Sequence, residues 1–162
     1  MSFQAYIDNI KAKTGKSPED FMKLAVEEAK LGVKENHGGP FGAVIVKDGK
    51  VIAKAHNTVL KDNDPTCHAE INAIRKASKI LDTFDLTGYE LYTTGKPCPM
   101  CRSAIQWAKI DNVYYVCDYN DAREIGFDEE GGNNDKYEEV QVNCEECKEL
   151  YKEYGSSSRE RY

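Results

Sequence analysis

The sequence predicts an α/β fold, a three-layer helix–sheet–helix sandwich around a mixed five-stranded sheet. Three observations support this class: a β-hairpin pattern in the first third of the chain, alternating helix and strand patterns after it, and no internal repeat or low-complexity linker in 162 residues. Hairpin strands are antiparallel and helix-connected strands are usually parallel, so we expect mixed strand directions with helices on both faces. A chain of this length is by default one domain, and we expect residues 1–162 to form it.

The N-terminal elements carry clear start and stop signals. Ser17 is a helix N-cap, Pro18 takes the first helical position, and the Gly-Gly-Pro run at residues 38–40 ends this helix. The hairpin covers residues 41–57, with Asp-Gly at its bend.

The later elements follow from hydrophobic periodicity and turn residues. We expect further helices at residues 67–80, 97–110 and 145–155, and further strands at residues 88–94, 112–119 and 138–143. With the two hairpin strands, these complete the predicted sheet.

Composition and charge limit the kinds of partner. Hydrophobic residues at 40% and charged residues at 31% are typical of a globular protein. No run approaches the roughly 20 apolar residues of a membrane span, and the N-terminus lacks the apolar core and cleavage site of a signal peptide. We therefore expect a cytoplasmic protein with no membrane partner. The net charge of −6 disfavours nucleic acid and favours a small, weakly polar partner.

Cys98 and Cys101 form a C-P-M-C motif at the start of a predicted helix. Residues three apart lie on one side of a helix, so both thiolates can bind one metal ion, and the helix N-terminus favours thiolate over thiol. In a reducing compartment such a pair is a metal or redox site rather than a structural disulfide, and the motif alone does not decide between the two.

A second polar motif, His68-Ala69-Glu70, also opens a predicted helix after a strand and a loop. Two helix N-termini that meet over one sheet edge would gather one nitrogen and two sulfurs, a ligand set that zinc prefers, and leave its fourth position to water. We therefore expect one Zn²⁺ per chain, on His68, Cys98 and Cys101. Glu70 need not bind metal. It can take a proton from water and deliver it to a leaving nitrogen, as in zinc deaminases with H-x-E and P-C-x-x-C motifs.

These motifs and the PFGAVIV strand before them resemble the cytidine deaminase superfamily of zinc hydrolases. The chain is similar to the bacterial guanine deaminase branch in NDPTCHAEINAIRKA, LYTTGKPCPMC, AIQWA and residues 121–128, and the similarity extends over about residues 18–130. The resemblance implies a cytidine deaminase-like fold, hydrolytic deamination of a free purine-like base, first of all guanine to xanthine plus ammonia, and a homodimer. In such a dimer the C-terminal helix and tail at residues 144–162 are swapped and reach the partner's active site.

The same resemblance implies a set of substrate-binding residues. Amide and carboxylate groups suit the edge of a planar heterocycle, and aromatic rings suit its faces. The set comprises Asn57, Phe41, the backbone N–H of Ala69, Trp107, Glu129 and the terminal Tyr162. For Phe41 and Trp107 the alternative is a place in the hydrophobic core.

Three positions depart from the guanine deaminase pattern and leave the substrate open. Lys96 replaces a glutamate before Pro-Cys, Arg102 stands where a small or apolar residue is usual, and Glu129 is one methylene longer than the usual aspartate. The alternatives are a tRNA adenosine deaminase, a deaminase of cytosine, guanosine or a triazine, and a non-catalytic zinc-binding module.

The other cysteines have several interpretations. Cys144 and Cys147 form a second C-x-x-C motif, which can bind a metal by itself or complete a four-cysteine zinc site with the first pair. A four-cysteine site would leave the His-Ala-Glu motif without a role. Cys67 and Cys117 are most simply thiols in the core.

Overall fold

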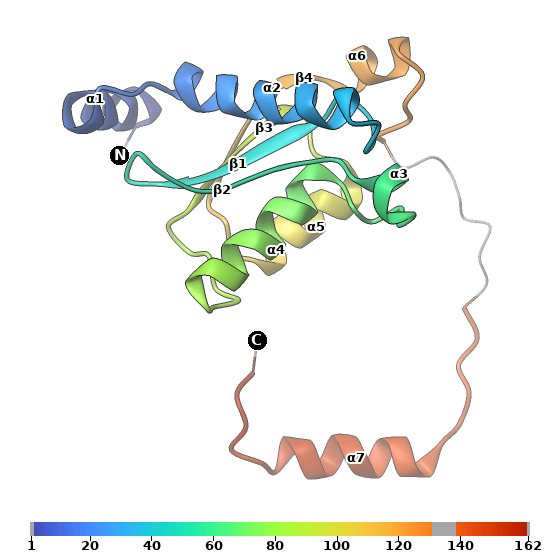
Figure 1. Ribbon diagram of the computed structural model, residues 1–162. Helices are drawn as coiled ribbons and strands as arrows, with labels where there is room; N and C mark the ends of the chain where they lie inside the picture. Colours follow the sequence, from blue (N-terminus) through green and yellow to red (C-terminus); the bar gives the residue numbers. More distant parts are fainter. Residues whose placement is uncertain (1, 131–138, 162) are drawn as a thin grey trace. The chain divides into compact units, whose positions relative to one another are not determined.

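Within the described residues the sheet has four strands, in the order β2-β1-β3-β4. The structure is a computed structural model that describes residues 2–130 and 139–161, and the chain divides into two compact units, Met1–Gly132 and Asn133–Tyr162. The strands are β1 (Gly42–Lys47), β2 (Lys50–His56), β3 (Glu90–Gly95) and β4 (Asn112–Cys117). β1 pairs antiparallel with β2 and β3, whereas β3 pairs parallel with β4, which confirms the predicted mixed sheet (Figure 1).

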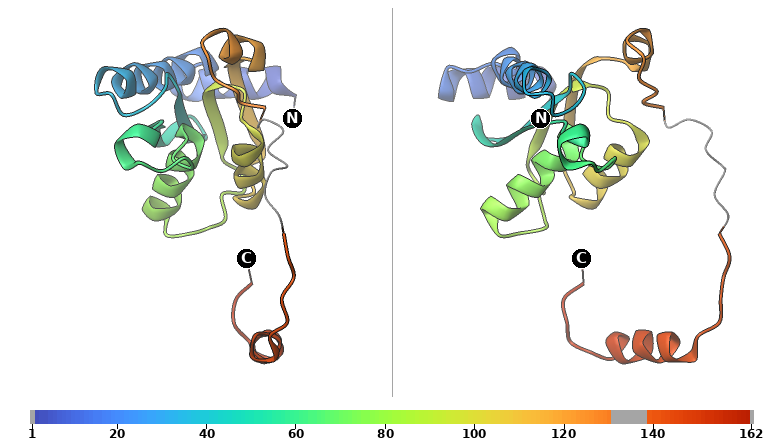
Figure 2. Two further views of the ribbon diagram at one scale, coloured as in Figure 1. Left: turned by 90° about the vertical axis from the view of Figure 1, so that its right-hand side faces the viewer. Right: turned by 45° about the vertical axis from the view of Figure 1, so that its right-hand side comes forward.

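Helices cover both faces of this sheet. α2 (Pro18–Lys34) lies on one face, and α4 (Ala69–Leu81) and α5 (Pro99–Trp107) lie on the other (Figure 1). The two further views in Figure 2 show the same separation of the layers. The predicted α/β class and the three-layer sandwich are therefore confirmed.

The hydrophobic core lies on both sides of the central strand β1. Ala43 and Ile45 belong to the apolar cluster shared with α4 and α5, whereas Val44 and Val46 belong to the cluster shared with α2. Successive side chains of a strand point to opposite faces of the sheet, so both faces of β1 are buried.

The start and turn signals form the structures that the sequence predicts. At the start of α2 the Asp20 carboxylate accepts the Ser17 backbone N–H at 2.7 Å, which is part of a capping box. Asp48 and Gly49 at the hairpin bend have φ values of 50° and 75°, the positive values that a type I′ turn requires.

The predicted fifth strand is wrong for the residues that the structure describes. Residues 139–143 do not form a strand, and the side chains of Val140 and Val142 are 77% and 81% exposed. A strand is stabilised by hydrogen bonds to a neighbouring strand, and the described residues of this unit include no strand that could supply them.

Among the described residues, three helices lie outside the elements expected from the sequence. They are α1 (Phe3–Thr14), α3 (Val59–Asp62) and α6 (Tyr119–Glu124). None of the described helices combines the length and apolar character needed to cross a bilayer.

The second unit contains α7 (Glu145–Gly155), at the position that the sequence predicts. The tail after it folds back on this helix, because Arg161 Nη2 donates to the Tyr154 carbonyl at 2.8 Å. The Arg161 guanidinium also lies 4.6 Å from the centroid of the Tyr154 ring.

Candidate active site

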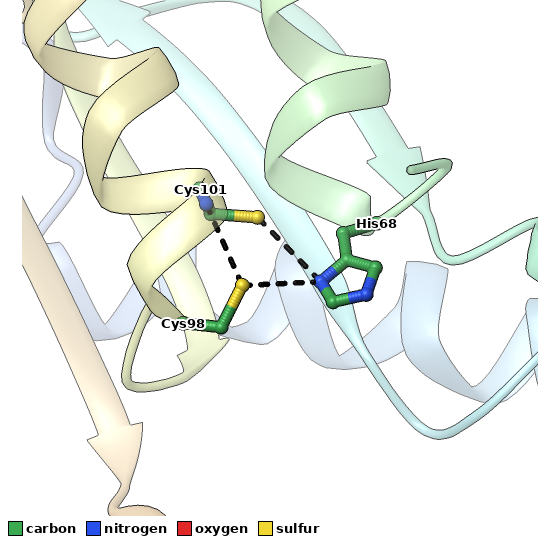
Figure 3. A group of neighbouring side chains, drawn as sticks. All are labelled: His68, Cys98 and Cys101. Atoms are coloured by element: carbon green, nitrogen blue, oxygen red, sulfur yellow. Dashed lines mark hydrogen bonds between the residues drawn. The ribbon is translucent and has the colours of Figure 1, made fainter. Parts of the chain in front are cut away.

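Two helix N-termini position the candidate metal ligands. His68 is the N-cap of α4 and Cys98 is the N-cap of α5, both with extended backbone, and Cys101 lies in the first turn of α5. Figure 3 shows the three side chains pointing toward one another from these two helix starts. This is the convergence that the two sequence motifs predict.

The distances within this group fit the ligands of one metal ion. His68 Nδ1 lies 3.5 Å from Cys98 Sγ and 3.6 Å from Cys101 Sγ, and the three ligand atoms all lie within 4.8 Å of one another. Tetrahedral zinc, with Zn–N of about 2.0 Å and Zn–S of about 2.3 Å, sets N···S distances of about 3.5 Å. One nitrogen and two sulfurs at this spacing therefore suit zinc and leave one coordination position open.

The two cysteine thiols have pKa values that are shifted in opposite directions. The hydrogen bond from the Cys101 thiol lowers the pKa of Cys98 to about 4, and the same bond together with burial raises the pKa of Cys101. The Cys101 backbone N–H also donates to Cys98 Sγ at 3.5 Å. Zinc deprotonates a thiol that it binds, so both sulfurs can serve as thiolate ligands.

Glu70 is buried beside the metal-ligand group without belonging to it. It lies in the first turn of α4, and Thr93 on β3 donates from Oγ1 to Glu70 Oε1 at 3.1 Å. Burial raises the pKa of Glu70. A carboxyl group with a raised pKa is suited to accepting and releasing a proton near neutral pH, which is the role that the sequence predicts.

A pocket of about 440 Å³ opens onto the candidate site at His68 and Glu70, whereas Cys98 and Cys101 lie outside its lining. Five residues expected from the sequence line it: Phe41, Asn57, His68, Glu70 and Glu129. The rest of the lining comes mainly from the ends of β3 and β4 and from α6.

Neighbouring residues fix the orientation of the Asn57 side chain. Its Oδ1 accepts the Val59 backbone N–H at 3.0 Å, which leaves the amide nitrogen as the donor available to a ligand. Gly38 approaches so closely that a Cβ there would lie 2.1 Å from Asn57 Oδ1. The loop before β1 therefore needs glycine at this position to keep Asn57 where it is.

Phe41 and Glu129 come from loops that pack together. The ring of Phe127, two residues before Glu129, meets the Phe41 ring edge to face, with 5.1 Å between centroids. Glu129 is half-buried in the pocket wall, where desolvation raises its pKa. The aromatic contact joins the loop that carries the carboxylate to the loop that carries Phe41.

The other expected substrate residues lie outside the pocket lining or outside the described residues. Trp107 ends α5 with a side chain that is 70% exposed, so it lies neither in the pocket lining nor in the core. Ala69 is buried at the first position of α4, where backbone N–H groups have no acceptor within the helix. Tyr162 is not among the residues that the structure describes.

The remaining cysteines divide between the two units. Cys67 is buried, as expected, whereas Cys117 is exposed and lines the pocket, so the core interpretation is wrong for Cys117. Cys144 and Cys147 are exposed at the start of α7. In the part of the chain that the structure describes, the candidate metal group includes neither of them.

Thr93 and Tyr119 also contribute to the site, although neither belongs to the sequence motifs. Thr93 orients Glu70, and the signal for it is a polar residue in a strand that leads into the C-P-M-C loop. Tyr119 lines the pocket, and its hydroxyl donates to the Pro97 carbonyl at 2.6 Å. No spacing pattern indicates that contact, because it joins two segments that meet only in the folded chain.

Comparison with known proteins assigns this site to a class. Residues 16–117 match the family model described as the cytidine and deoxycytidylate deaminase zinc-binding region. The chain belongs to this family, and with its His68, Cys98 and Cys101 group it is a zinc-dependent hydrolytic deaminase.

The individual proteins that this chain resembles include guanine deaminases and a tRNA adenosine deaminase. The guanine deaminase of Bacillus subtilis strain 168 is 53% identical over 111 residues, which are 68% of this chain and 71% of that protein. A crystal structure of guanine deaminase from B. subtilis matches with a TM-score of 0.80 at 41% identity, covering 89% of this chain and 97% of that one. The guanine deaminase structure from Nitrosomonas europaea matches with a TM-score of 0.67 at 30% identity, covering 75% and 72%. The tRNA-specific adenosine deaminase of Aquifex aeolicus is 45% identical over 97 residues, 60% of this chain and 64% of that protein.

Proposed function

We propose that this protein is a guanine deaminase, which converts guanine and water to xanthine and ammonia. The observation that carries the proposal is one pocket lined by His68 of the zinc-ligand group, by the buried Glu70 carboxylate and by polar and aromatic groups that suit a planar base. Similarity to the guanine deaminases of B. subtilis and N. europaea supports guanine as the base.

The metal ligands and Glu70 have separate roles in this reaction. His68, Cys98 and Cys101 would hold zinc, which when bound supplies a Lewis acid that makes water nucleophilic at neutral pH. Glu70 takes a proton from that water and gives it to the exocyclic nitrogen. The oxygen of water ends on the ring carbon, and the nitrogen leaves as ammonia. We expect the protein to act in the cytoplasm, where the thiol ligands stay reduced.

The base is held by groups that match its edges and faces. The Asn57 amide nitrogen donates to a ring acceptor, and the Glu129 carboxylate accepts from a ring N–H. The Phe41 ring packs against the base, and the Ala69 N–H donates to it. Trp107 and Tyr162 complete the set that the family resemblance implies, and for them the support is that resemblance.

The charges around the pocket favour a free base over a nucleic acid. Four carboxylates line the pocket, those of Glu70, Asp118, Asp121 and Glu129, together with the cation Lys96. A tRNA brings phosphates, whose binding depends on lysine and arginine clusters. The tRNA adenosine deaminases among the relatives make this the alternative to test.

The active protein is a homodimer in which each chain, as one deaminase domain, lends residues 144–162 to its partner. β4 lies at the edge of the sheet with Tyr115 and Val116 exposed, and the second unit exposes Val140, Val142 and Leu150. Exposed edge strands and isolated apolar segments are commonly covered in an assembly. These features support the dimer that the family resemblance implies.

Mixing two inactive variants tests the exchange of C-terminal segments. A Glu70→Gln chain lacks the proton carrier but keeps its tail, and a Tyr162→Ala chain has the opposite defect. If tails are exchanged, unfolding and refolding the two variants together restores activity, because some sites combine an intact Glu70 with an intact tail. Activity that stays at the sum of the two separate variants would contradict the exchange.

Ammonia release across a panel of substrates tests the proposed activity. The full chain, with its zinc content measured, is incubated with guanine, guanosine, cytosine, adenine, ammeline and a tRNA anticodon stem-loop. We expect guanine to give the highest kcat/KM. Faster deamination of the stem-loop would establish the tRNA alternative, and zinc binding without turnover on any substrate would establish a non-catalytic module.

A further inference from the structure

A single tyrosine hydroxyl joins the two ends of the segment that carries both sulfur ligands. Tyr119 Oη donates to the Pro97 carbonyl at 2.6 Å and accepts from Arg102 Nη2 at 3.5 Å. Pro97 immediately precedes Cys98, and Arg102 immediately follows Cys101. The hydroxyl therefore contacts the chain on both sides of the C-P-M-C motif.

The ring of Tyr119 also has a contact of its own, with Lys96. Lys96 Nζ lies 4.7 Å from the ring centroid, and the Lys96 backbone N–H donates to the Cys117 carbonyl at 2.7 Å. A lysine and an arginine, the two cations that depart from the family pattern, thus meet on one aromatic side chain. Their positions on either side of the metal-ligand segment give both departures a common structural role.

The backbone that carries Tyr119 is also fixed. Tyr119 is the first residue of α6, and the two acidic residues around it form a capping box. The Asp118 backbone N–H donates to Asp121 Oδ2 at 2.8 Å, and the Asp121 N–H donates back to Asp118 Oδ1 at 3.0 Å. The tyrosine is therefore attached to a capped helix start rather than to a free loop.

We propose that Tyr119 is a positioning residue whose contacts hold both cysteine ligands in the geometry that zinc needs, and that Lys96 and Arg102 in turn hold Tyr119. We call this set of contacts the brace. Partners outside the ligand shell orient metal ligands, and removing one typically weakens metal binding by roughly 10- to 100-fold. The hydrogen bond from Arg102 polarises the Tyr119 hydroxyl. This polarisation strengthens the hydrogen bond that the hydroxyl donates to the Pro97 carbonyl. The proposal concerns the zinc site and does not depend on which base is deaminated.

Zinc release from the loaded full chain tests the brace without any substrate. Tyr119→Phe keeps the ring and its contact with Lys96 but removes the hydroxyl. With a chromogenic chelator in excess, we expect zinc to dissociate about 10-fold faster from this variant than from the wild type. The control is Tyr89→Phe, whose ring has a similar lysine contact with Lys47 Nζ 4.9 Å from its centroid, and which we expect to release zinc at the wild-type rate. Equal release rates for Tyr119→Phe and the wild type would overturn the proposal.

The two cations give a second test, because they act on different parts of Tyr119. Arg102→Met should speed zinc release in the wild-type background but add nothing in Tyr119→Phe, since its partner is the hydroxyl. Lys96→Met should speed release in both backgrounds, since its partner is the ring. Additive effects of Arg102→Met and Tyr119→Phe would contradict the brace. Melting temperatures of the zinc-loaded variants, measured in parallel, separate a local effect from general destabilisation.

Failure of the brace and failure of the proposed function give different experimental results. If no base is deaminated, the zinc-release rates still support or overturn the brace. If guanine is deaminated and Tyr119→Phe releases zinc like the wild type, the brace alone is wrong.

Discussion

At the scale of single residues, the proposed proton carrier Glu70 gives a sharp test of whether the zinc site is catalytic. We expect Glu70→Gln to keep about one zinc per chain, because the side chain lies outside the metal group. Its turnover should fall by roughly 10²- to 10⁴-fold, since an amide cannot accept the proton. Metal analysis and ammonia release on the same sample provide the measurement. Glu27→Gln, on the exposed side of α2, is the control, and wild-type turnover in Glu70→Gln would show that the proton takes another route.

Glu129 tests the recognition of the base. Glu129→Gln exchanges the carboxylate for a neutral amide, which removes the negative charge that would strengthen the proposed hydrogen bond from a ring N–H. We therefore expect KM for guanine to rise by about 10-fold with unchanged zinc content. Initial rates over a range of guanine concentrations provide the measurement. The neighbouring Glu130 pairs with Arg123 at the surface, so Glu130→Gln should leave KM unchanged. Equal KM values for the two variants would remove Glu129 from the base-binding set.

The residues that could be predicted from the sequence are those whose chemistry is local. His68, Cys98 and Cys101 stand in short motifs at helix starts, and the structure brings them together as expected. Tyr119 could not be predicted, and the polar character of Thr93 does not identify its partner, because both contact other segments of the fold. The exposed position of Trp107 in a single chain is likewise a property of the fold, which the helical pattern of α5 does not specify.

At the scale of elements, the close packing of the loop before β1 against the end of β2 sets the position of Asn57. A Cβ at Gly38 would meet both Asn57 Oδ1 and the Asn57 carbonyl, at 2.1 Å and 2.8 Å. We expect Gly38→Ala to lower the free energy of unfolding by roughly 1–3 kcal/mol, as overpacking does, and to raise KM for guanine because Asn57 must move.

Denaturant unfolding and steady-state kinetics measure the two effects. Gly155→Ala is the control for stability, since a Cβ at Gly155 has no neighbouring atom within 4 Å. Glu27→Gln, on the exposed side of α2, is the control for KM. If Gly38→Ala changes neither stability nor KM, the loop does not hold Asn57 in the way that the distances indicate.

The elements predicted correctly are those with strong local signals. The capped helix α2 and the Asp-Gly hairpin form as expected because the residues that begin and turn them are adjacent in sequence. The valine alternation at residues 139–143 has the same strand pattern, but a strand needs a neighbour, which a sequence pattern cannot supply. The short helices α3 and α6 span 4 and 6 residues, too few for a hydrophobic period to be visible.

At the scale of the whole molecule, the sandwich places the starts of α4 and α5 side by side, and this arrangement creates the site (Figure 3). The alternating pattern of helices and strands predicts the layers, since each element must bury one face. The order of the strands and the pocket that forms beside β3 and β4 come from packing between distant segments. The motifs therefore predict the reaction better than they predict the pocket-lining residues that select the substrate.

We propose that this chain hydrolyses guanine with oxygen taken from water. The most direct test is to incubate the zinc-loaded protein with guanine in ¹⁸O-labelled water and to analyse the product by mass spectrometry. We predict xanthine that carries one labelled oxygen, with one ammonia released for each xanthine formed. Guanine that is recovered unchanged, or xanthine without the label, would contradict the account.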